Sequence, residues 1–260
     1  MSANKFKPKT ILLIPDIHAK PNDDLARLEK MRRWLKLNKQ PIHKVIQIGD
    51  LWDFDSLCTH DMHTPEWHTR TLRGDIDAGF RALDIILAAA KDHQLLPSDV
   101  LITGGNHEDR YDKYLKSDNR LLTSDFPPTV RALLATNPKT QGVKYQGFLK
   151  PYTTYGITFS HYFVSGVMGR PVGGERPAAN LLRSQFISSV CGHSHLYDFA
   201  ERTRGDASKI YALVAGCFVN PEAPFAYAGA ARKLWWNGFH LLHCYKPGEF
   251  DVQSVSIERL

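Results

Sequence analysis

Four short segments of the sequence combine side chains that bind metal ions. They are Asp16-Ile17-His18, Gly49-Asp50, Gly105-Asn106-His107-Glu108 and Gly192-His193-Ser194-His195. Carboxylate, amide and imidazole groups without thiolate suit metals such as Mn, Fe, Zn, Ni or Co. In an extended segment, alternate side chains share a face, so His193 and His195 would point to the same side. These segments predict a catalytic metal centre.

Each segment follows a short apolar run that predicts a buried strand. The runs cover residues 11–14, 45–48, 100–103 and 187–191. They are rich in β-branched residues and end near Gly or Pro, which favours strands over helices. The candidate ligands therefore follow strand ends.

Two helices are expected between these strands. Residues 23–39 place Leu25, Leu28 and Leu35 on one face, which predicts an amphipathic helix. Residues 76–90 follow the helical period closely, and Asp75, Asp77 and Arg81 are expected to face outward. Strands that alternate with helices predict a parallel or mixed sheet, in which ligands bind beyond the carboxyl ends of the strands.

Length and composition predict one soluble domain over residues 1–260. The apolar content of 43% allows a substantial core, and no linker or internal repeat divides the chain. No apolar run has the length of a signal peptide or a membrane span, so we expect a cytoplasmic protein without a membrane partner. The 4 cysteines form no CxxC pair.

The charge balance allows a polyanionic partner but does not require one. The chain has 33 Lys and Arg against 27 Asp and Glu, a formal charge of +6. A basic surface attracts nucleic acid. The excess is small and spread along the chain, so charge alone does not identify such a partner.

The ordered motifs resemble those of the calcineurin-like metallophosphoesterases. That family has Asp-x-His, Gly-Asp, Gly-Asn-His-[Asp/Glu], a lone His and Gly-His-x-His in this order. His161, which follows the strand-like residues 155–160, matches the lone His. The match covers residues 16–195, about two thirds of the chain. The resemblance implies two packed mixed sheets flanked by helices, a four-layer α/β/β/α sandwich. The C-terminal strands expected at 210–214, 238–245 and 252–257 would complete the second sheet.

The resemblance also implies a dinuclear metal site, with Mn as the first candidate. The first metal would take Asp16, His18, Asp50 and His195, and the second would take Asp50, Asn106, His161 and His193. Asp50 would bridge the two. Two cations about 3.5–4 Å apart can hold the attacking and leaving oxygens of an in-line displacement.

The resemblance assigns the chemistry of the leaving group to His107. The matching His of the family faces the scissile phosphate, as general acid or as a cation, and Asn106 is also expected to contact the substrate. The candidate catalytic residues are therefore Asp50, His107 and Glu108. The carboxylate that orients His107 stays open between Glu108, Asp53 and another residue.

Two flanking segments could shape the substrate. Residues 52–73 are rich in aromatic and His side chains that could stack on a base or simply pack on one another. Residues 165–183 combine glycines with Arg170 and Arg176, which could bind phosphate, although a plain connector fits equally well.

The expected function is hydrolysis of a phosphate mono- or diester by a hydroxide that bridges two metals. One alternative is a nuclease or nucleotide phosphodiesterase that acts on DNA or RNA. A phosphoprotein phosphatase is disfavoured, because Phe54 and Asp55 follow Asp53 where that class has Arg and Gly. An alternative of another kind is a binding scaffold without activity.

Overall fold

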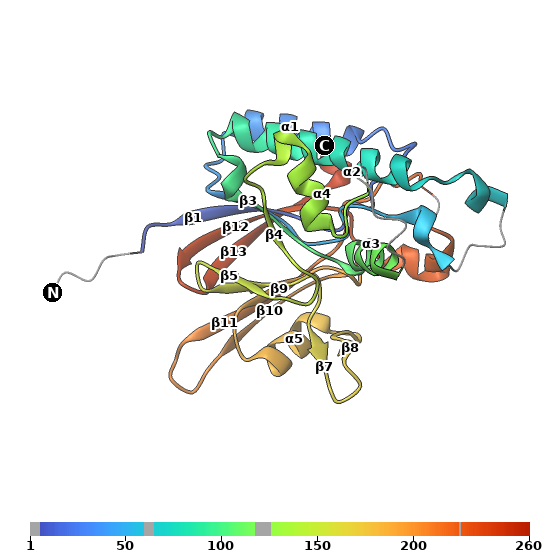
Figure 1. Cartoon of the computed structure of the whole chain (residues 1–260). Coiled ribbons are helices and arrows are strands. Elements are labelled where there is room, and N and C mark those ends of the chain that lie inside the picture. Colours follow the sequence, from blue (N-terminus) through green and yellow to red (C-terminus); the bar gives the residue numbers. More distant parts are fainter. Residues whose placement is uncertain (1–5, 60–64, 118–125, 224) are drawn as a thin grey trace.

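Two mixed sheets pack face to face in this computed structural model, and helices cover their outer faces (Figure 1). The structure describes residues 6–59, 65–117, 126–223 and 225–260. The expected two-sheet α/β sandwich is confirmed. No helix within these described ranges has both the length and the apolar content to cross a membrane.

The larger sheet has the strand order β13-β12-β1-β2-β3-β4. Its strands are β1 (Lys9–Ile14), β2 (Lys44–Gln47), β3 (Val100–Thr103), β4 (Lys144–Gln146), β12 (Gly238–Lys246) and β13 (Glu249–Ser256). Strands β1 to β4 are parallel, and the β12–β13 hairpin joins β1 in the antiparallel sense. The predicted strands at 11–14, 45–48 and 100–103 are therefore confirmed.

The smaller sheet has the strand order β10-β11-β9-β6-β5. Its strands are β5 (Tyr152–Thr154), β6 (Ile157–Phe159), β9 (Ser189–Cys191), β10 (Tyr197–Thr203) and β11 (Lys209–Ala215). Strands β6, β9 and β11 are parallel. A separate hairpin pairs β7 (Val164–Ser165) with β8 (Arg170–Pro171).

The expectation for the C-terminal strands is partly wrong. Strand β11 lies in the smaller sheet, as expected, but β12 and β13 extend the larger sheet beside β1. The reason is the pairing partner: Leu12 lies opposite Leu241, and Leu13 lies opposite His240. Alternation of apolar and polar residues indicates a strand, but it does not determine which of the two sheets the strand joins.

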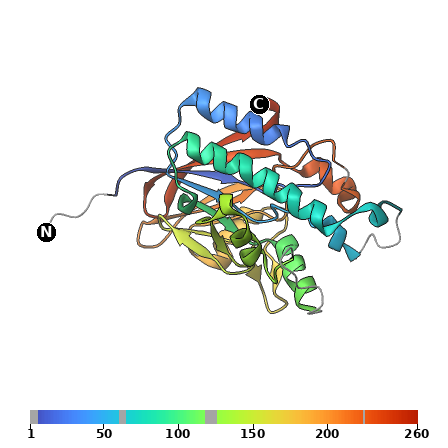
Figure 2. The ribbon, with the colours of Figure 1, turned by 45° about the horizontal axis from the view of Figure 1, so that its top comes forward.

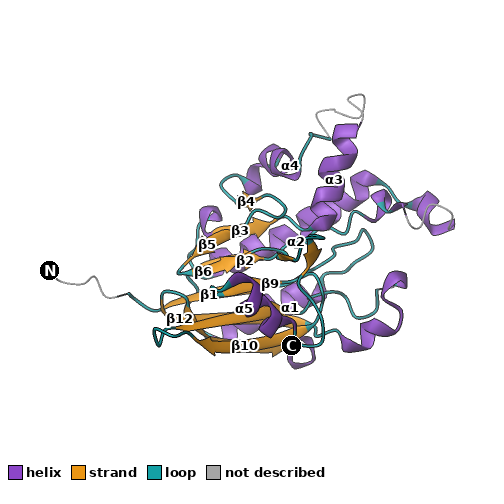
Figure 3. Ribbon diagram, turned by 90° about the horizontal axis from the view of Figure 1, so that it is seen from below, coloured by secondary structure: helices purple, strands orange, loops and turns teal. Residues whose placement is uncertain are grey.

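The helices form the two outer layers. They are α1 (Ala26–Asn38), α2 (Leu72–Asp92), α3 (Asn106–Ser117), α4 (Val130–Thr136) and α5 (Pro177–Gln185). The short 3₁₀ helices are η1 (Asp55–Leu57), η3 (Pro65–Thr69), η4 (Pro97–Asp99), η6 (Pro138–Thr140), η7 (Ala226–Leu234) and η8 (Ile257–Arg259). Helices α1 and α2 lie side by side over the larger sheet (Figure 2). Helix α5 covers the smaller sheet at β9, β10 and β11 (Figure 3).

The side chains of β1 show why both faces of the larger sheet are apolar. Leu12 and Ile14 pack toward α1 and α2, whereas Ile11 and Leu13 pack into the core between the sheets. Successive side chains of a strand point to opposite faces, so a strand covered on both sides needs a continuous apolar run. Full burial of each such side chain stabilises the fold by roughly 1.5–3 kcal/mol.

One outward-facing prediction on α2 is wrong. Asp75 is buried, and its carboxylate accepts hydrogen bonds from the backbone N–H and the hydroxyl of Ser56 at 2.9 and 2.5 Å. These bonds hold the loop around η1 against the first turn of α2. Because burial disfavours the charged carboxylate, the pKa of Asp75 is raised to about 6.

Candidate metal centre

The seven predicted ligands converge at the carboxyl ends of strands from both sheets. Asp16 and His18 follow β1, Asp50 follows β2, and Asn106 begins α3 just after β3. The smaller sheet supplies the remaining ligands, His161 after β6 and His193 and His195 after β9. Parallel strands of two facing sheets end at one rim, which brings residues distant in sequence together.

The side chains form overlapping groups that could each hold a cation. Within each group the candidate ligand atoms lie within 4.8 Å of one another. The groups are Asp16–His18–His195, His18–Asp50–His107 and Asp50–His161–His193.

Asp50 lies between the two halves of the cluster. Its Oδ2 atom is 3.6 Å from His18 Nε2 and 3.3 Å from His161 Nε2. Asn106 completes the second half, because its Oδ1 atom is 3.1 Å from His161 Nε2. Asp50 is shared by two of the groups, and its role as a bridge between two metals stays a prediction.

An unpaired carboxylate oxygen indicates that the cluster suits a cation. Asp16 is fully buried, and its Oδ1 atom has no hydrogen-bond partner. A buried acceptor without a partner costs about 1–3 kcal/mol, and more when it is charged. The other oxygen of this carboxylate, Oδ2, lies 3.3 Å from His195 Nε2, so a divalent cation among Asp16, His18 and His195 would offset the cost of burying the charged group. The donor set of carboxylate and imidazole therefore fits such an ion.

The electrostatics of the cluster keep the carboxylates ionised. Burial opposes ionisation of Asp50, but the neighbouring His161 and His107 hold its pKa well below the usual range. The charges of Asp50 and Asp16 overcome burial at His161 and raise its pKa to about 10. Burial and the nearby His161 lower the pKa of His193 to about 4. Without metal, one imidazolium therefore neutralises part of the acidic charge.

Four ligands adopt a backbone conformation that is rare outside glycine. The φ angles are 49° at His18, 50° at Asp50, 70° at His193 and 59° at His195. Such left-handed residues cost of order 1–3 kcal/mol each and persist where the surroundings impose them. The backbone N–H groups of Ile17 and His18 both donate to the Asp50 carbonyl, at 3.0 and 2.9 Å.

Two motif glycines leave room for the carboxylates. A Cβ atom on Gly105 would lie 2.0 Å from Asp50 Oδ1, and one on Gly192 would lie 2.2 Å from Asp16 Oδ1. No side chain fits at either distance. Both positions therefore require glycine, because the Asp50 carboxylate lies against Gly105 and the Asp16 carboxylate lies against Gly192.

Asp53 orients two imidazoles. His18 Nδ1 donates to the Asp53 carboxylate at 2.7 Å, and His107 Nδ1 donates to the Asp53 backbone carbonyl at 2.5 Å. Each bond leaves the Nε2 atom of its ring available for a metal or a substrate. Lys20 Nζ lies 3.0 Å from the other Asp53 oxygen. His107 is thus held by the backbone carbonyl of Asp53, and the carboxylate of the same residue lies 3.4 Å from its Nδ1 atom.

The Glu108 carboxylate binds the backbone of the ligand loops, and its catalytic role stays a prediction. Its buried carboxylate accepts hydrogen bonds from the backbone N–H groups of Asp50, Gly105 and Trp52 at 2.9, 2.7 and 3.1 Å. Glu108 is in the first turn of α3 and is not among the residues that line the cavity over the cluster. Burial and the charge of Asp50 raise the pKa of Glu108 to about 7. Glu108 is therefore a support for the ligand loops.

Arg27 of α1 ties together the loops that hold Asp16 and His18. Its guanidinium is buried and donates to the carbonyl of Ile17 at 3.1 Å and to that of Phe218 at 2.6 Å. The same group pairs with the Asp23 carboxylate at 2.7 Å. In turn, the Phe218 N–H donates to the Asp16 carbonyl at 2.7 Å.

A cavity of about 260 Å³ opens over the cluster. Its lining consists of His18, Asp50, Asn106, His107, His193, Ser194, His195, Ala231 and Trp235. His107 is among these lining residues, beside the candidate ligands, and its catalytic role stays a prediction. Trp235, which was not among the predicted site residues, also lines the cavity. No local signal links it to His195, which lies far away in the chain.

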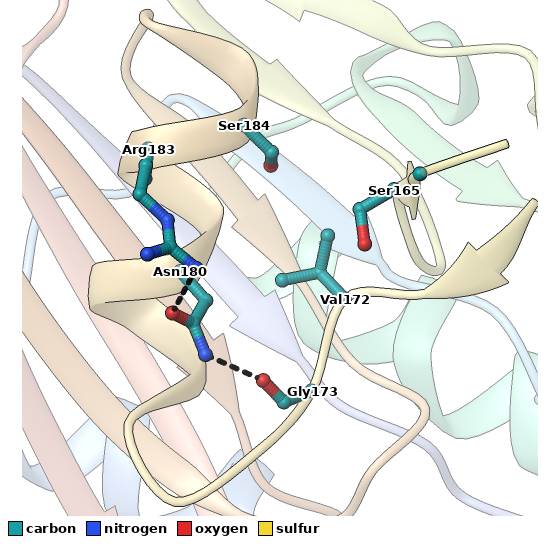
Figure 4. A pocket seen from close by; sticks show the side chains of 7 residues that line it. Ser165, Val172, Gly173, Asn180, Arg183 and Ser184 are labelled. Atoms are coloured by element: carbon teal, nitrogen blue, oxygen red, sulfur yellow. Dashed lines mark hydrogen bonds between the residues drawn. The ribbon is translucent and has the colours of Figure 1, made fainter.

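The predicted phosphate-binding arginines do not line this cavity. Arg170 in β8 and Arg176 before α5 are both exposed. Residues 165–184 instead enclose a separate hollow of about 310 Å³, between the β7–β8 hairpin and α5. There Asn180 accepts from Arg183 and donates to the Gly173 carbonyl (Figure 4). Arg170 and Arg176 are therefore not among the residues that line the cavity over the cluster, and their contact with a substrate stays a prediction.

The aromatic segment 52–73 packs mainly on the protein itself. Trp52 and Phe54 are fully buried in the core under α2, and their rings stack at 6.0 Å. Trp67 packs edge-on against His68 at 5.6 Å. His60 and His63, also part of that prediction, lie outside the described residues.

No protein-family model matches the chain, and no curated protein matches it. What the fold and the site define is a two-sheet α/β sandwich whose buried Asp and His side chains can hold metal ions.

Proposed function

We propose that the chain is a metal-dependent phosphoester hydrolase of the calcineurin-like type, with two divalent metals. One observation carries the proposal: the seven residues matched to the family's ligands, from motifs spread over residues 16–195, lie in one cluster. An accidental motif match would not bring these side chains to the same rim of two sheets.

The charge of the cluster suits a phosphate ester. Bound metals would polarise the phosphoryl oxygens and acidify a water molecule. Asp16 and Asp50 are the only carboxylates in the described metal-binding groups. They would offset only half of the charge of two divalent cations, so a phosphate would meet net positive charge.

His107 supplies the proton chemistry in this proposal. Its Nδ1–H is bonded to the Asp53 carbonyl, so Nε2 is the atom that meets the cavity. A protonated Nε2 can donate to the leaving oxygen or stabilise negative charge on the phosphoryl group. No side-chain nucleophile is needed.

A nucleotide phosphodiesterase is the second candidate. The cavity over the cluster has about the size of a small ligand, at about 260 Å³, and it has an aromatic side chain, Trp235, in its wall. A small cavity favours a nucleotide or another small ester over a long polymer.

The test compares D50N with D251N, because both remove one carboxylate and Asp251 is exposed on β13. We expect wild type and D251N to hydrolyse p-nitrophenyl phosphate or its bis ester only with Mn²⁺ or Ni²⁺. We expect D50N to lose about 100-fold or more, since it removes the ligand between the two halves. A strong preference for the bis ester would identify a diesterase.

Absence of turnover of both esters by the metal-loaded wild type would favour the inactive scaffold instead. Full activity in D50N would contradict the proposed site.

A further inference from the structure

An aromatic wall formed by Phe225 and Trp235 borders the first half of the cluster. The Trp235 ring lies 4.1 Å from the His195 ring, centroid to centroid, with the planes at 84°. Phe225 packs edge-on against Trp235 at 5.4 Å and against His18 at 5.8 Å. Trp235 is half-buried and lines the cavity beside the ligands.

The backbone holds Trp235 in a fixed relation to His195. The Trp236 N–H donates to the His195 carbonyl at 3.0 Å, and the Trp236 carbonyl accepts from Cys217 N–H at 2.8 Å. The Trp235 N–H donates to the Arg232 carbonyl at 3.1 Å, which closes the end of η7. The wall is thus attached to the strand-end segment that supplies a ligand.

Two cations cover the Phe225 side of the wall. Lys20 Nζ and Arg232 Cζ lie 5.0 and 5.5 Å from the Phe225 ring centroid. Lys20 is already paired with Asp53 and Asp55. Trp235 is the member of this wall that lines the cavity, and positive charge lies next to it at Phe225, so an organic group on this side of the cavity would meet the Trp235 side chain.

We infer that this site selects phosphoesters whose organic group is a planar aromatic ring, either a nucleobase or an aryl group. Trp235 is the residue that determines this specificity. Hydrolysis of the ester rests on the proposed function. Binding of the aromatic ring, by contrast, depends on the Trp235 side chain and can be tested separately. Stacking of a base on an aromatic side chain contributes about 1–3 kcal/mol. Small polar esters such as glycerol phosphate lack that contact.

Calorimetric binding tests the inference without turnover. Adenosine 5′-monophosphate and glycerol 2-phosphate are titrated into the full chain in the presence of a chelator, so that neither ester is hydrolysed, for wild type, W235A, W235F and L234A. Leu234 is the matched control because it neighbours Trp235 and is 70% exposed. We expect wild type and L234A to prefer the nucleotide about tenfold, W235A to lose that preference, and W235F to keep most of it.

Kinetics supply a second readout. Phenyl phosphate and glycerol 2-phosphate are compared as substrates, and W235A is expected to lower the ratio of kcat/KM for the phenyl ester to kcat/KM for the glycerol ester about tenfold, mainly through the KM of the phenyl ester. Equal binding of the two ligands by wild type, or equal weakening of both in W235A, would overturn the inference. If the metal-loaded wild type hydrolyses neither ester, the proposed hydrolase function fails, while the calorimetry still decides whether Trp235 recognises the ring.

Discussion

At the scale of single residues, the site depends on carboxylates that are buried yet kept charged. Asp16 and Asp50 lie against imidazoles, and the Asp16 Oδ1 atom accepts no hydrogen bond. The neighbouring glycines allow this density of ligands, since a Cβ on Gly105 or Gly192 would occupy the space of a carboxylate oxygen. Small changes at these positions should therefore act on metal binding directly.

We expect G105A to weaken metal binding at least tenfold and to destabilise the fold by about 1–3 kcal/mol. The added Cβ would lie 2.0 Å from Asp50 Oδ1, so the carboxylate or the backbone must move. Calorimetry with Mn²⁺ and urea unfolding measure the two effects. G205A is the matched control, because nothing lies within 4 Å of a Cβ at Gly205. Equal metal affinity in both variants would contradict the close approach.

Asp75 gives a prediction about pH and stability. Because its pKa is raised from 3.8 to about 6 in the fold, its ionisation favours the unfolded chain. Stability should fall as pH rises from about 4 to about 6 and then level off. D75N removes this loss while its Oδ1 still accepts from Ser56. We compare the free energy of unfolding of D75N minus that of wild type at two pH values. This difference should be about 2 kcal/mol larger at pH 7 than at pH 4, which means that D75N is relatively more stable at pH 7.

Urea unfolding at both pH values measures the difference, with D77N on the exposed face of α2 as the matched control. A relative stability of D75N that does not change with pH would show that Asp75 is not the titrating group.

At the scale of elements, the ligand loops are held by contacts from their neighbours as well as by their strands. The Glu108 carboxylate of α3 accepts hydrogen bonds from three backbone N–H groups in the loops after β2 and β3. Arg27 of α1 binds the carbonyls of Ile17 and Phe218. The helices therefore position ligands that they do not carry.

The Arg27–Asp23 pair should show strong coupling. R27M leaves the Asp23 charge buried and two carbonyls without a donor, so we expect a loss of about 3–5 kcal/mol in the free energy of unfolding. The double variant D23N/R27M removes the buried charge, and we expect it to be more stable than R27M. Urea unfolding of both single variants and the double variant measures the coupling. A double variant that loses the sum of the two single effects would contradict it.

At the scale of the whole molecule, the centre joins the two sheets. Asp16, His18, Asp50 and Asn106 come from the larger sheet, and His161, His193 and His195 come from the smaller one. A cation held by both sets acts across the sheet interface. Ligand binding to the folded state alone stabilises it by mass action.

We therefore expect Mn²⁺ to raise Tm, and to raise it more at pH 8 than at pH 6. His161 has a pKa of about 10 in the metal-free protein, raised from 6.5, so its proton must leave when the ring becomes a ligand. In the metal-free fold this imidazolium contributes stability that is complete below pH 6.5 and is lost toward pH 10. Thermal unfolding and proton release to a pH indicator on metal addition measure both effects. Metal binding without proton release would contradict the ligand role of His161.

The sequence by itself determined the parts of this protein that local pattern specifies. Apolar runs located β1, β2 and β3, and the periodic leucines located α1, because burial of one face sets the spacing. The motif residues Asp16, His18, Asp50 and Asn106 could be found because they directly follow these strands. The short spacing between ligand and strand is a local property.

Only the tertiary structure decided what depends on packing between distant segments. Loops that meet across the fold place Asp53 beside His18 and His107. They also give Glu108 its supporting role and bury Asp75. The same holds for the β12–β13 hairpin beside β1 and for Trp235 over His195. These contacts link residues that no sequence period relates, so their partners are fixed by how the sheets and helices assemble.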